Sequence, residues 1–504
     1  MTPAASRILL ALFLCVLLGA CSLAPRYERP GQDLPKEWRN IDLGTTPLNT
    51  DWWTRFNDPV LTALIEEALA KNQELAESMA NIESAAAQAG VGASQLFPSI
   101  DGTGSAGAES SSIRNSNQQT DYSPKTGMAR AVTSYNAKLT ASWEIDFWGK
   151  NRNYYTYLTD VLMKTVIGHE ALRLSVAAET AETYFALLAL DMQLDTARRT
   201  LKAREQSFGI YTSRYEQGDI TELDWQRARA QVETARAQVH TTAVSLDKKE
   251  AALAVLIGRS PREIINRAMP RGRSVDSMPA PPVLPAGLPS EMLLRRPDIR
   301  AAEFLIMAYN ANIGVARAKF FPSISLTGML GTLSGGFLNL FTNDSGVWNY
   351  GAAINLPILD FGNNWSNLRD AEAKKKAAIA AYNKTVQDAF KDVRTALTAQ
   401  READAIVKSM KAQVGSLRRA ADIAQLQYDN GYTDYLTVLD AQRELFSAEL
   451  SLASALEDRL DAVVSVCKAL GGGWRDNEGN TPAVPYLQTD ELVRAKTGER
   501  NTVK

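Results

Sequence analysis

The sequence predicts an α+β membrane protein with an internal duplication. Each chain is expected to contribute four strands to a β-barrel shared between copies, which long coiled-coil helices continue. Three observations predict this class: an export signal that ends at a cysteine, a Phe-Pro-Ser-Ile motif that occurs at 97–100 and again at 321–324, and two long helix-forming regions without a proline.

Composition excludes several functions. The 504 residues carry a formal net charge of −2, with 22% charged residues, so there is no basic footprint for nucleic acid. Only two histidines are present, although histidine is the residue used most in metal binding and acid–base catalysis. No nucleophile–base pair, metal cluster or phosphate loop stands out, so we expect neither an enzyme nor a cofactor.

The first twenty residues have the pattern of an export signal. Arg7 precedes the apolar run "ILLALFLCVLLGA", which is too short to cross a membrane as a helix. The run ends in "LGAC", which resembles a bacterial lipobox and implies cleavage before Cys21 and acylation of that cysteine. A plain signal peptide ending near a cysteine is the alternative. We expect residues 1–20 to be removed and residues 21–60 to form a lipid-anchored N-terminal segment.

The remaining chain contains two copies of one unit. "AGVGASQLFPSI" (89–100) and "IGVARAKFFPSI" (313–324) are identical at six of twelve positions. "RYEQGDITELDWQRA" (214–228) and "QYDNGYTDYLTVLDA" (427–441) share a tyrosine, a glycine, a leucine and an alanine. The proline-rich stretch between the copies is typical of an extended linker. The predicted boundaries are a first helix–hairpin–helix repeat at 61–260, a linker at 261–290, a second repeat at 291–473 and a tail at 474–504.

Each repeat should begin with a helix that stops before its Phe-Pro motif and continue with two strands. Residues 135–146 alternate apolar and polar without a break, and the apolar residues from Trp348 to Ile358 keep the same period. Alternation over about twelve residues is the length and pattern of a membrane β-strand. A soluble sheet packed on a core would alternate in the same way. Four aromatic residues are candidates for the membrane interface, with ordinary strand packing as the alternative: Trp143, Trp148, Trp348 and Tyr350.

The proline-free regions begin at Asn151 and at Asp360 and are rich in good helix formers. Gly218 and Gly431 interrupt them, so each repeat should form two antiparallel helices, one of about 65 residues and one of about 40. Apolar residues spaced by three and four predict coiled-coil packing. A soluble coiled coil without a pore would show the same spacing.

Four strands cannot close a membrane barrel, because the smallest have about eight. An open edge in lipid leaves unpaired backbone groups that cost several kcal/mol each. Several copies must therefore share one barrel, and the helices must follow the same axis as a tube. The strand count alone permits any multiple of four.

These residues resemble the outer-membrane factors of the TolC superfamily, and most closely the OprM-type outer-membrane lipoproteins of tripartite efflux systems. The lipobox, "LLRRPDIRAAE" (293–303), "GVARAKFFPSISLTG" (314–328) and "QYDNGYTDYLTVLDAQRELFSAE" (427–449) carry the resemblance. It implies a homotrimer, a twelve-stranded outer-membrane barrel, a twelve-helix periplasmic tunnel and a passive exit duct for drugs or other small toxic compounds. The implied partners are a periplasmic adaptor protein and an inner-membrane pump of the resistance-nodulation-division (RND) class.

In the resembled family the tunnel closes near its periplasmic tip, which here means the turns at Gly218 and Gly431. These turns, within "QGDITE" and "NGYTDY", would also face the adaptor. By position, Asp440 matches the aspartate that rings the closed end, and Leu436 matches an apolar ring one turn before it. Asp224 matches an aspartate in the first-repeat helix of TolC itself and is a further candidate for the gate.

Tyr428 matches a tyrosine whose hydroxyl ties neighbouring coils in that family. The sequence departs from the TolC pattern at Thr437 and Thr433, which replace an aspartate and an arginine, so the resemblance favours a simpler closure by leucine and aspartate. Three copies of Asp440 around one axis should favour cations. Helix capping or a solvated helix face would account for Asp440 and Asp224 without any gate.

Two other functions remain open at this point: an exit duct for type I protein secretion, and a structural periplasmic lipoprotein with a coiled-coil stalk.

Overall fold

The computed structural model describes residues 22–35, 50–109, 132–266, 268–279 and 296–474. These residues form two compact units. The first draws on the described residues of 22–30, 84–163 and 304–380, and the second on those of 31–83, 164–303 and 381–474. The expected signal peptide, Cys21 and the tail beyond Trp474 lie outside the described residues, so those boundaries stay predictions.

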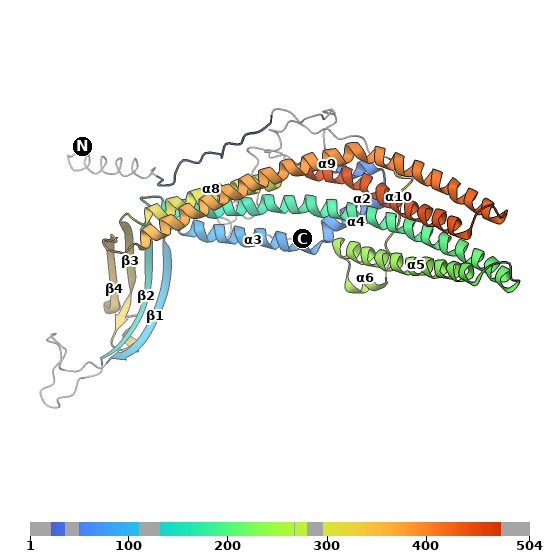
Figure 1. The fold of residues 1–504 in the computed structure, drawn as a ribbon. Helices are drawn as coiled ribbons and strands as arrows, with labels where there is room; N and C mark the ends of the chain where they lie inside the picture. The colour runs from blue at the N-terminus through green and yellow to red at the C-terminus, as the bar shows by residue number, and fades with distance from the viewer. Residues whose placement is uncertain (1–21, 36–49, 110–131, 267, 280–295, 475–504) are drawn as a thin grey trace. The chain divides into compact units, whose positions relative to one another are not determined.

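The first unit contains one antiparallel sheet (Figure 1). Its strands are β1 (Ser99–Glu109), β2 (Val132–Ile145), β3 (Ser323–Ser334) and β4 (Gly346–Asn355), in that spatial order. Each repeat therefore supplies one hairpin, and the expected four strands are confirmed. The expected continuation of the last strand to Ile358 is wrong: β4 ends at Asn355, before Pro357, which has no N–H to donate to a strand ladder.

The strand register sorts the side chains of the sheet onto two faces. Leu139 of β2 lies opposite Gly102 of β1 and Leu330 of β3, and Leu330 lies opposite Trp348 of β4. Because side chains alternate along a strand, every second residue from this row shares its face. That face carries no charged residue, and most of its large side chains are exposed in the single chain. All charged residues of the four strands lie on the opposite face: Asp101, Glu109, Lys138 and Glu144.

The helices of the two repeats have matching lengths. Before the hairpins, α3 (Gln73–Ser94) and α8 (Pro297–Ala318) have 22 residues each. After them, α4 (Lys150–Glu216) and α9 (Asn363–Asp429) have 67 each. The returning helices α5 (Glu222–Leu256) and α10 (Tyr435–Ala469) have 35 each. The internal duplication and the long antiparallel helix pairs are confirmed.

The stretch expected as a linker begins with a packed segment. A short helix, α6 (Pro261–Asn266), opens it, and Arg271 then forms ion pairs with Asp191 of α4 and Glu250 of α5. These paired charges hold the first part of the stretch against the second unit instead of leaving it extended. The remaining short elements are α2 (Pro59–Lys71), N-capped by Asp58, and 3-10 turns η1 (Trp52–Phe56), η4 (Phe337–Asn339) and η5 (Asn343–Ser345).

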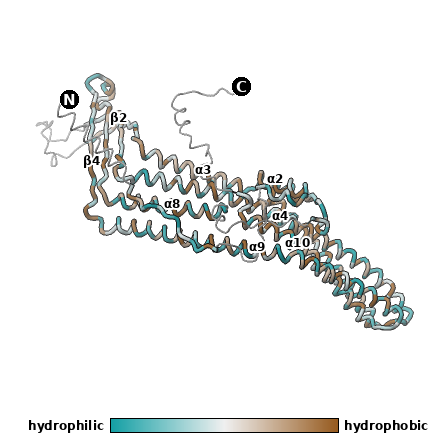
Figure 2. Tube along the Cα trace, turned by 90° about the horizontal axis from the view of Figure 1, so that it is seen from above, coloured by the Kyte–Doolittle hydropathy of each residue, from teal (hydrophilic) through white to brown (hydrophobic). Residues whose placement is uncertain are grey.

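Hydrophobic and hydrophilic residues are interspersed along the long helices (Figure 2). Among the helices of the described residues, none combines the length and the apolar character needed to span a bilayer.

Partly buried carboxyl groups lie where α10 packs in the second unit. Burial, together with nearby Glu457, Glu182 and Asp458, raises the pKa of Asp461 to about 8, and Lys249 opposes the shift. The Oδ1 atom of Asp461 is buried without a hydrogen-bond partner among the described residues. Burial likewise raises the pKa values of Glu182 and Glu457.

We expect the free energy of unfolding to fall as pH rises from about 4 to about 8. In this window the folded chain keeps the Asp461 proton that the unfolded chain, with a pKa of 3.8, has released. Below the window both states are protonated, so the contribution of Asp461 is fully present. Asp461→Asn should flatten the pH dependence of the thermal midpoint measured by circular dichroism, with Asp422→Asn at an exposed position of α9 as control. An Asp461→Asn variant that loses stability with pH as steeply as the wild type would contradict this.

Candidate functional site

Both helix pairs turn at a glycine in the left-handed conformation. Gly218 has φ of +80° and Gly431 has φ of +75°. The N–H of each donates to the carbonyl of a tyrosine, Tyr215 at 3.0 Å and Tyr428 at 2.9 Å. L side chains rarely adopt this conformation, which explains why the two repeats share a glycine here.

The returning helices are capped by side chains of these turns. The Thr221 hydroxyl accepts from the N–H of Asp224 at 3.2 Å, and the Asp434 carboxylate accepts from the N–H of Thr437 at 3.0 Å. The Thr437 hydroxyl also donates to Asp434, and these bonds hold the pKa of the Asp434 carboxyl below its usual value. Thr433 donates to Thr437 at 3.0 Å. The two threonines that depart from the TolC pattern therefore take part in capping.

Three tyrosines join the ends of the helix pairs. The rings of Tyr211 (α4) and Tyr435 (α10) are 4.6 Å apart, and Tyr428 (α9) lies 5.4 Å from Tyr435. The buried cluster also contains Val438, Leu439, Ala424 and the α5 residue Ala228, and the partly buried Tyr428 packs against it. Burial raises the pKa of Tyr211 to about 12 and raises that of Tyr435 as well, so these hydroxyls are neutral near pH 7. We call this group the tip cluster.

Tyr428 lies in the tip cluster, and its position agrees with a tie between coils. Burial raises its pKa, while the charge of Arg214 of α4 and a hydrogen bond from that side chain oppose the rise. Tyr428 thus connects α9 to α4 and α10 within one chain.

Leu436 and Asp440 lie outside the tip cluster, one helical turn apart on α10. Leu436 is 45% exposed, whereas its neighbours Val438 and Leu439 are buried. The Asp440 carboxylate is exposed and pairs with Arg443 at 3.2 Å. The two predicted gate residues therefore share a face that the single chain leaves open.

The Asp224 carboxylate is bonded to two neighbouring side chains of its own chain. Its carboxylate accepts from the Thr221 hydroxyl at 2.9 Å and pairs with Arg227 at 3.6 Å. Asp224 therefore takes part in the cap of α5, which is the alternative to a gate role named above. Among the described residues, no hydrogen bond or ion pair joins Asp224 to Asp440.

Three residues at the tip were not singled out from the sequence. Arg443 partners Asp440, and Tyr432 of the second turn is 84% exposed. Arg227 is the sixth residue of α5, as Asp440 is the sixth of α10, so the repeats place opposite charges at equivalent positions. Comparing the two aligned repeat motifs at this position could have identified Arg227.

The predicted interface aromatics fall into two groups. Trp348 and Tyr350 stack on each other at 5.7 Å on the uncharged face of the sheet and are both strongly exposed. Trp143 lies on the same face, and its indole N–H donates to the Leu96 carbonyl at 3.2 Å. Trp148 follows the strand and donates to the Pro322 carbonyl at 2.8 Å, which is an ordinary packing role.

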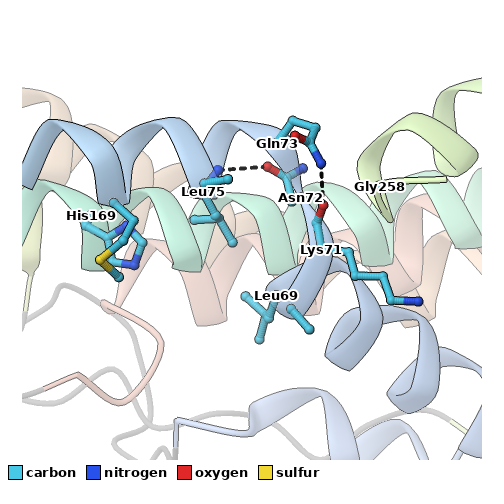
Figure 3. A pocket seen from close by; sticks show the side chains of 10 residues that line it. Leu69, Lys71, Asn72, Gln73, Leu75, His169 and Gly258 are labelled. Carbon is cyan, nitrogen blue, oxygen red and sulfur yellow. Dashed lines mark hydrogen bonds between the residues drawn. The ribbon is translucent and has the colours of Figure 1, made fainter. Parts of the chain in front are cut away.

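A hollow of about 460 Å³ lies where α2 meets α3 in the second unit (Figure 3). Its polar groups already have structural partners. Asn72 accepts from the N–H groups of Glu74 and Leu75, and the His169 ring lies 3.2 Å from the Ser78 hydroxyl. Within the described residues, no group of three or more His, Cys, Asp or Glu side chains could hold a metal ion.

The chain was compared with known proteins. The model of the family described as outer membrane efflux protein matches residues 64–259 and 288–472. The toluene efflux pump outer membrane protein TtgF of Pseudomonas putida is 35% identical, covering 94% of this chain and 98% of its own length. The cation efflux system protein CusC of Escherichia coli is 32% identical, covering 93% and 99%. The Campylobacter jejuni CmeC outer membrane channel is similar in structure, with a TM-score of 0.84, 26% identity, and coverage of 96% and 99%.

These matches extend over both repeats and include the sheet and the long helices. The fold class expected from the sequence is confirmed, and the outer membrane is its location. The chain belongs to the outer membrane efflux protein family.

Proposed function

We propose that this protein is the exit duct of a tripartite efflux system, in which three copies share a twelve-stranded barrel and continue as a helical tunnel. The uncharged, exposed face that runs across all four strands supports this, because such a face is suited to lipid. Among the described strands, β1 and β4 each pair on one side only. Their outer edges can therefore pair with β4 and β1 of neighbouring copies, which satisfies the backbone groups that lipid would leave unpaired.

The proposed partners are a periplasmic adaptor and an inner-membrane RND pump. The two glycine turns would meet the adaptor, with Tyr432 as an exposed aromatic contact of the kind enriched at binding hot spots. We assign Leu436 and Asp440 to the closed gate and Tyr428 to the tip cluster that supports it. Asp224 supports the gate through the cap of α5. Acylation of Cys21 would anchor the chain in the same membrane.

The passing compounds are proposed to be small and toxic. The relatives named above are a toluene efflux protein and a cation efflux protein. We therefore propose that the duct admits chemically different compounds and that the pump selects which compound is exported.

Purified protein should form channels in planar lipid bilayers. We expect discrete, low-conductance steps that need no energy source, because a duct conducts passively once it is inserted. The same preparation should run as a heat-dissociable trimer. Protein that stays soluble as a monomer without detergent, and gives no conductance, would favour the structural-stalk alternative.

Leu330→Arg should greatly reduce the trimer in the outer membrane. It places a charge on the proposed lipid face, at a cost of about 2–4 kcal/mol if the site lies near the bilayer midplane. Met329→Arg is the matched control, because the adjacent residue lies on the opposite face. Heat-dissociable trimer in membrane fractions would be quantified for both. Equal loss in the two variants would contradict the assignment of faces.

A further inference from the structure

Inside one chain the two repeats meet through an aromatic contact at the foot of the strands, the end of the sheet that adjoins the long helices. Trp148 follows β2 of the first repeat, and Phe321 precedes β3 of the second. Their rings stack with centroids 4.7 Å apart, and the Trp148 indole N–H donates to the Pro322 carbonyl at 2.8 Å. The seam between β2 and β3 therefore continues from the sheet into an aromatic contact.

Two matching hydrogen bonds show which residues of the repeats correspond. Asn151 donates through Nδ2 to the Gln95 carbonyl, and Asn364 donates in the same way to the Lys319 carbonyl, both at 3.2 Å. Residues before the hairpins are therefore related by an offset of 224 positions, and residues after them by an offset of 213.

These offsets give the aromatic contact a counterpart that the described residues of one chain do not form. Phe361 takes the position of Trp148, and Phe97 takes the position of Phe321. Phe361 follows β4 and Phe97 precedes β1, so the two rings belong to opposite edges of the four-stranded sheet. Phe361 is 92% exposed and Phe97 is 69% exposed. One aromatic pair is made inside the chain, and the equivalent pair is left apart.

The backbone at Phe361 is strained, with φ of +50°. A bulky L residue rarely adopts this conformation, and such strain is found mainly at functional sites, where the surrounding structure enforces it. The turn has one residue between Asp360 and Gly362, where the first repeat has two between Asp146 and Gly149. Both glycines have positive φ, so the two turns align at their glycines. The shorter turn thus holds a large apolar ring almost fully in solvent.

We propose that Phe361 of one copy packs on Phe97 of the neighbouring copy, as Trp148 packs on Phe321 inside each chain. The inference rests on the proposed shared barrel, in which β4 pairs with β1 of the next copy. In an antiparallel pair the end of one strand lies beside the start of the other, so Phe361 and Phe97 come to the same end of that seam. Burying both rings removes apolar surface from water and stabilises the contact between copies.

The strand register agrees with this contact. Leu139 of β2 lies opposite Leu330 of β3 within the chain. The two offsets transfer this pair to Ala352 of β4 and Ala106 of β1. Both alanines lie on the uncharged face of the sheet, so the transferred register continues that face from one copy to the next. A shift of one residue would break this continuity.

The test is cross-linking between differently tagged chains. Phe97→Cys and Phe361→Cys are made in separate full-length chains that carry different affinity tags and are expressed together. Outer membranes are treated with a short bismaleimide, and we expect a covalent dimer that carries both tags. Cys467 is buried, and burial raises the pKa of its thiol to about 12, so it will not react. Wild-type chains treated in parallel give the background from the native cysteines.

The matched control replaces Phe361→Cys with Leu338→Cys. Leu338 is as exposed as Phe361, but it precedes β4 and so lies at the other end of the strands. This combination should give no dimer with both tags above the background. The same yield of that dimer in the control and in the test pair would contradict the proposed contact.

Heat stability provides a second measurement, which decides the question if the cysteine variants do not assemble. Phe361→Ala should lower the temperature at which the trimer dissociates on gels by several degrees, and Leu338→Ala should leave it unchanged. Cysteine variants that form trimers without the two-tag dimer would overturn the aromatic contact and leave the duct in place. So would Phe361→Ala trimers as heat-stable as the wild type where the cysteine variants fail to assemble. If wild-type chains form no trimer at all, the shared barrel itself is refuted.

Discussion

Gly431→Arg is expected to abolish efflux while trimers still form. The glycine has φ of +75°, where an L side chain is strained by about 1–2 kcal/mol. A Cβ there would meet nothing within 4 Å, so the fold has room for the side chain. The loss should come from the altered turn and from a bulky cation at the surface proposed for the adaptor. Drug resistance of a deletion strain carrying the variant would fall to that of the strain without the protein.

Two controls separate the effect of backbone strain at Gly431 from the effect of the large side chain. Gly431→Asn adopts the left-handed conformation more readily than other residues and should retain much of the efflux. Gly415→Arg adds the same side chain to an open position inside α9 and should be tolerated. Normal resistance with Gly431→Arg, at wild-type protein levels, would remove this turn from the adaptor interface. Gly218→Arg offers the parallel test in the first repeat.

Asp440→Ala is expected to raise single-channel conductance several-fold and to admit large antibiotics. In the proposed trimer three copies of this exposed carboxylate approach one axis, where like charges hold hydrating water and counter-ions. Removing them widens the constriction and lowers the preference for cations. Planar-bilayer recordings with reversal potentials in a salt gradient would measure both effects.

A second substitution separates the effect of the Asp440 charge from the effect of its side-chain size. Asp440→Asn removes the charge at nearly constant size, so it should weaken cation preference with a smaller gain in conductance. Asp422→Ala removes an exposed carboxylate on α9 and is the control. If Asp440→Ala conducted and selected ions as the wild type does, another residue would form the gate.

The sequence by itself determined the repeat, the four strands and the long helices of this outer membrane efflux protein. These follow from local signals, namely alternation of apolar residues, helix-forming composition and glycines at the turns. The same signals placed both turns correctly, because a left-handed residue between two helices is a local requirement. They extended the last strand too far, since Leu356 and Ile358 keep the apolar period beyond Pro357.

Only the tertiary structure decided how side chains distant in the chain meet. It joined Tyr211, Tyr428 and Tyr435 into one cluster. It also showed Asp224 bonded to Thr221, the N-cap of its own helix, and placed residues 22–25 against Asn153 and Asn310. The sequence could not supply these contacts, because they depend on which helix faces meet across hundreds of residues and no local periodicity records that.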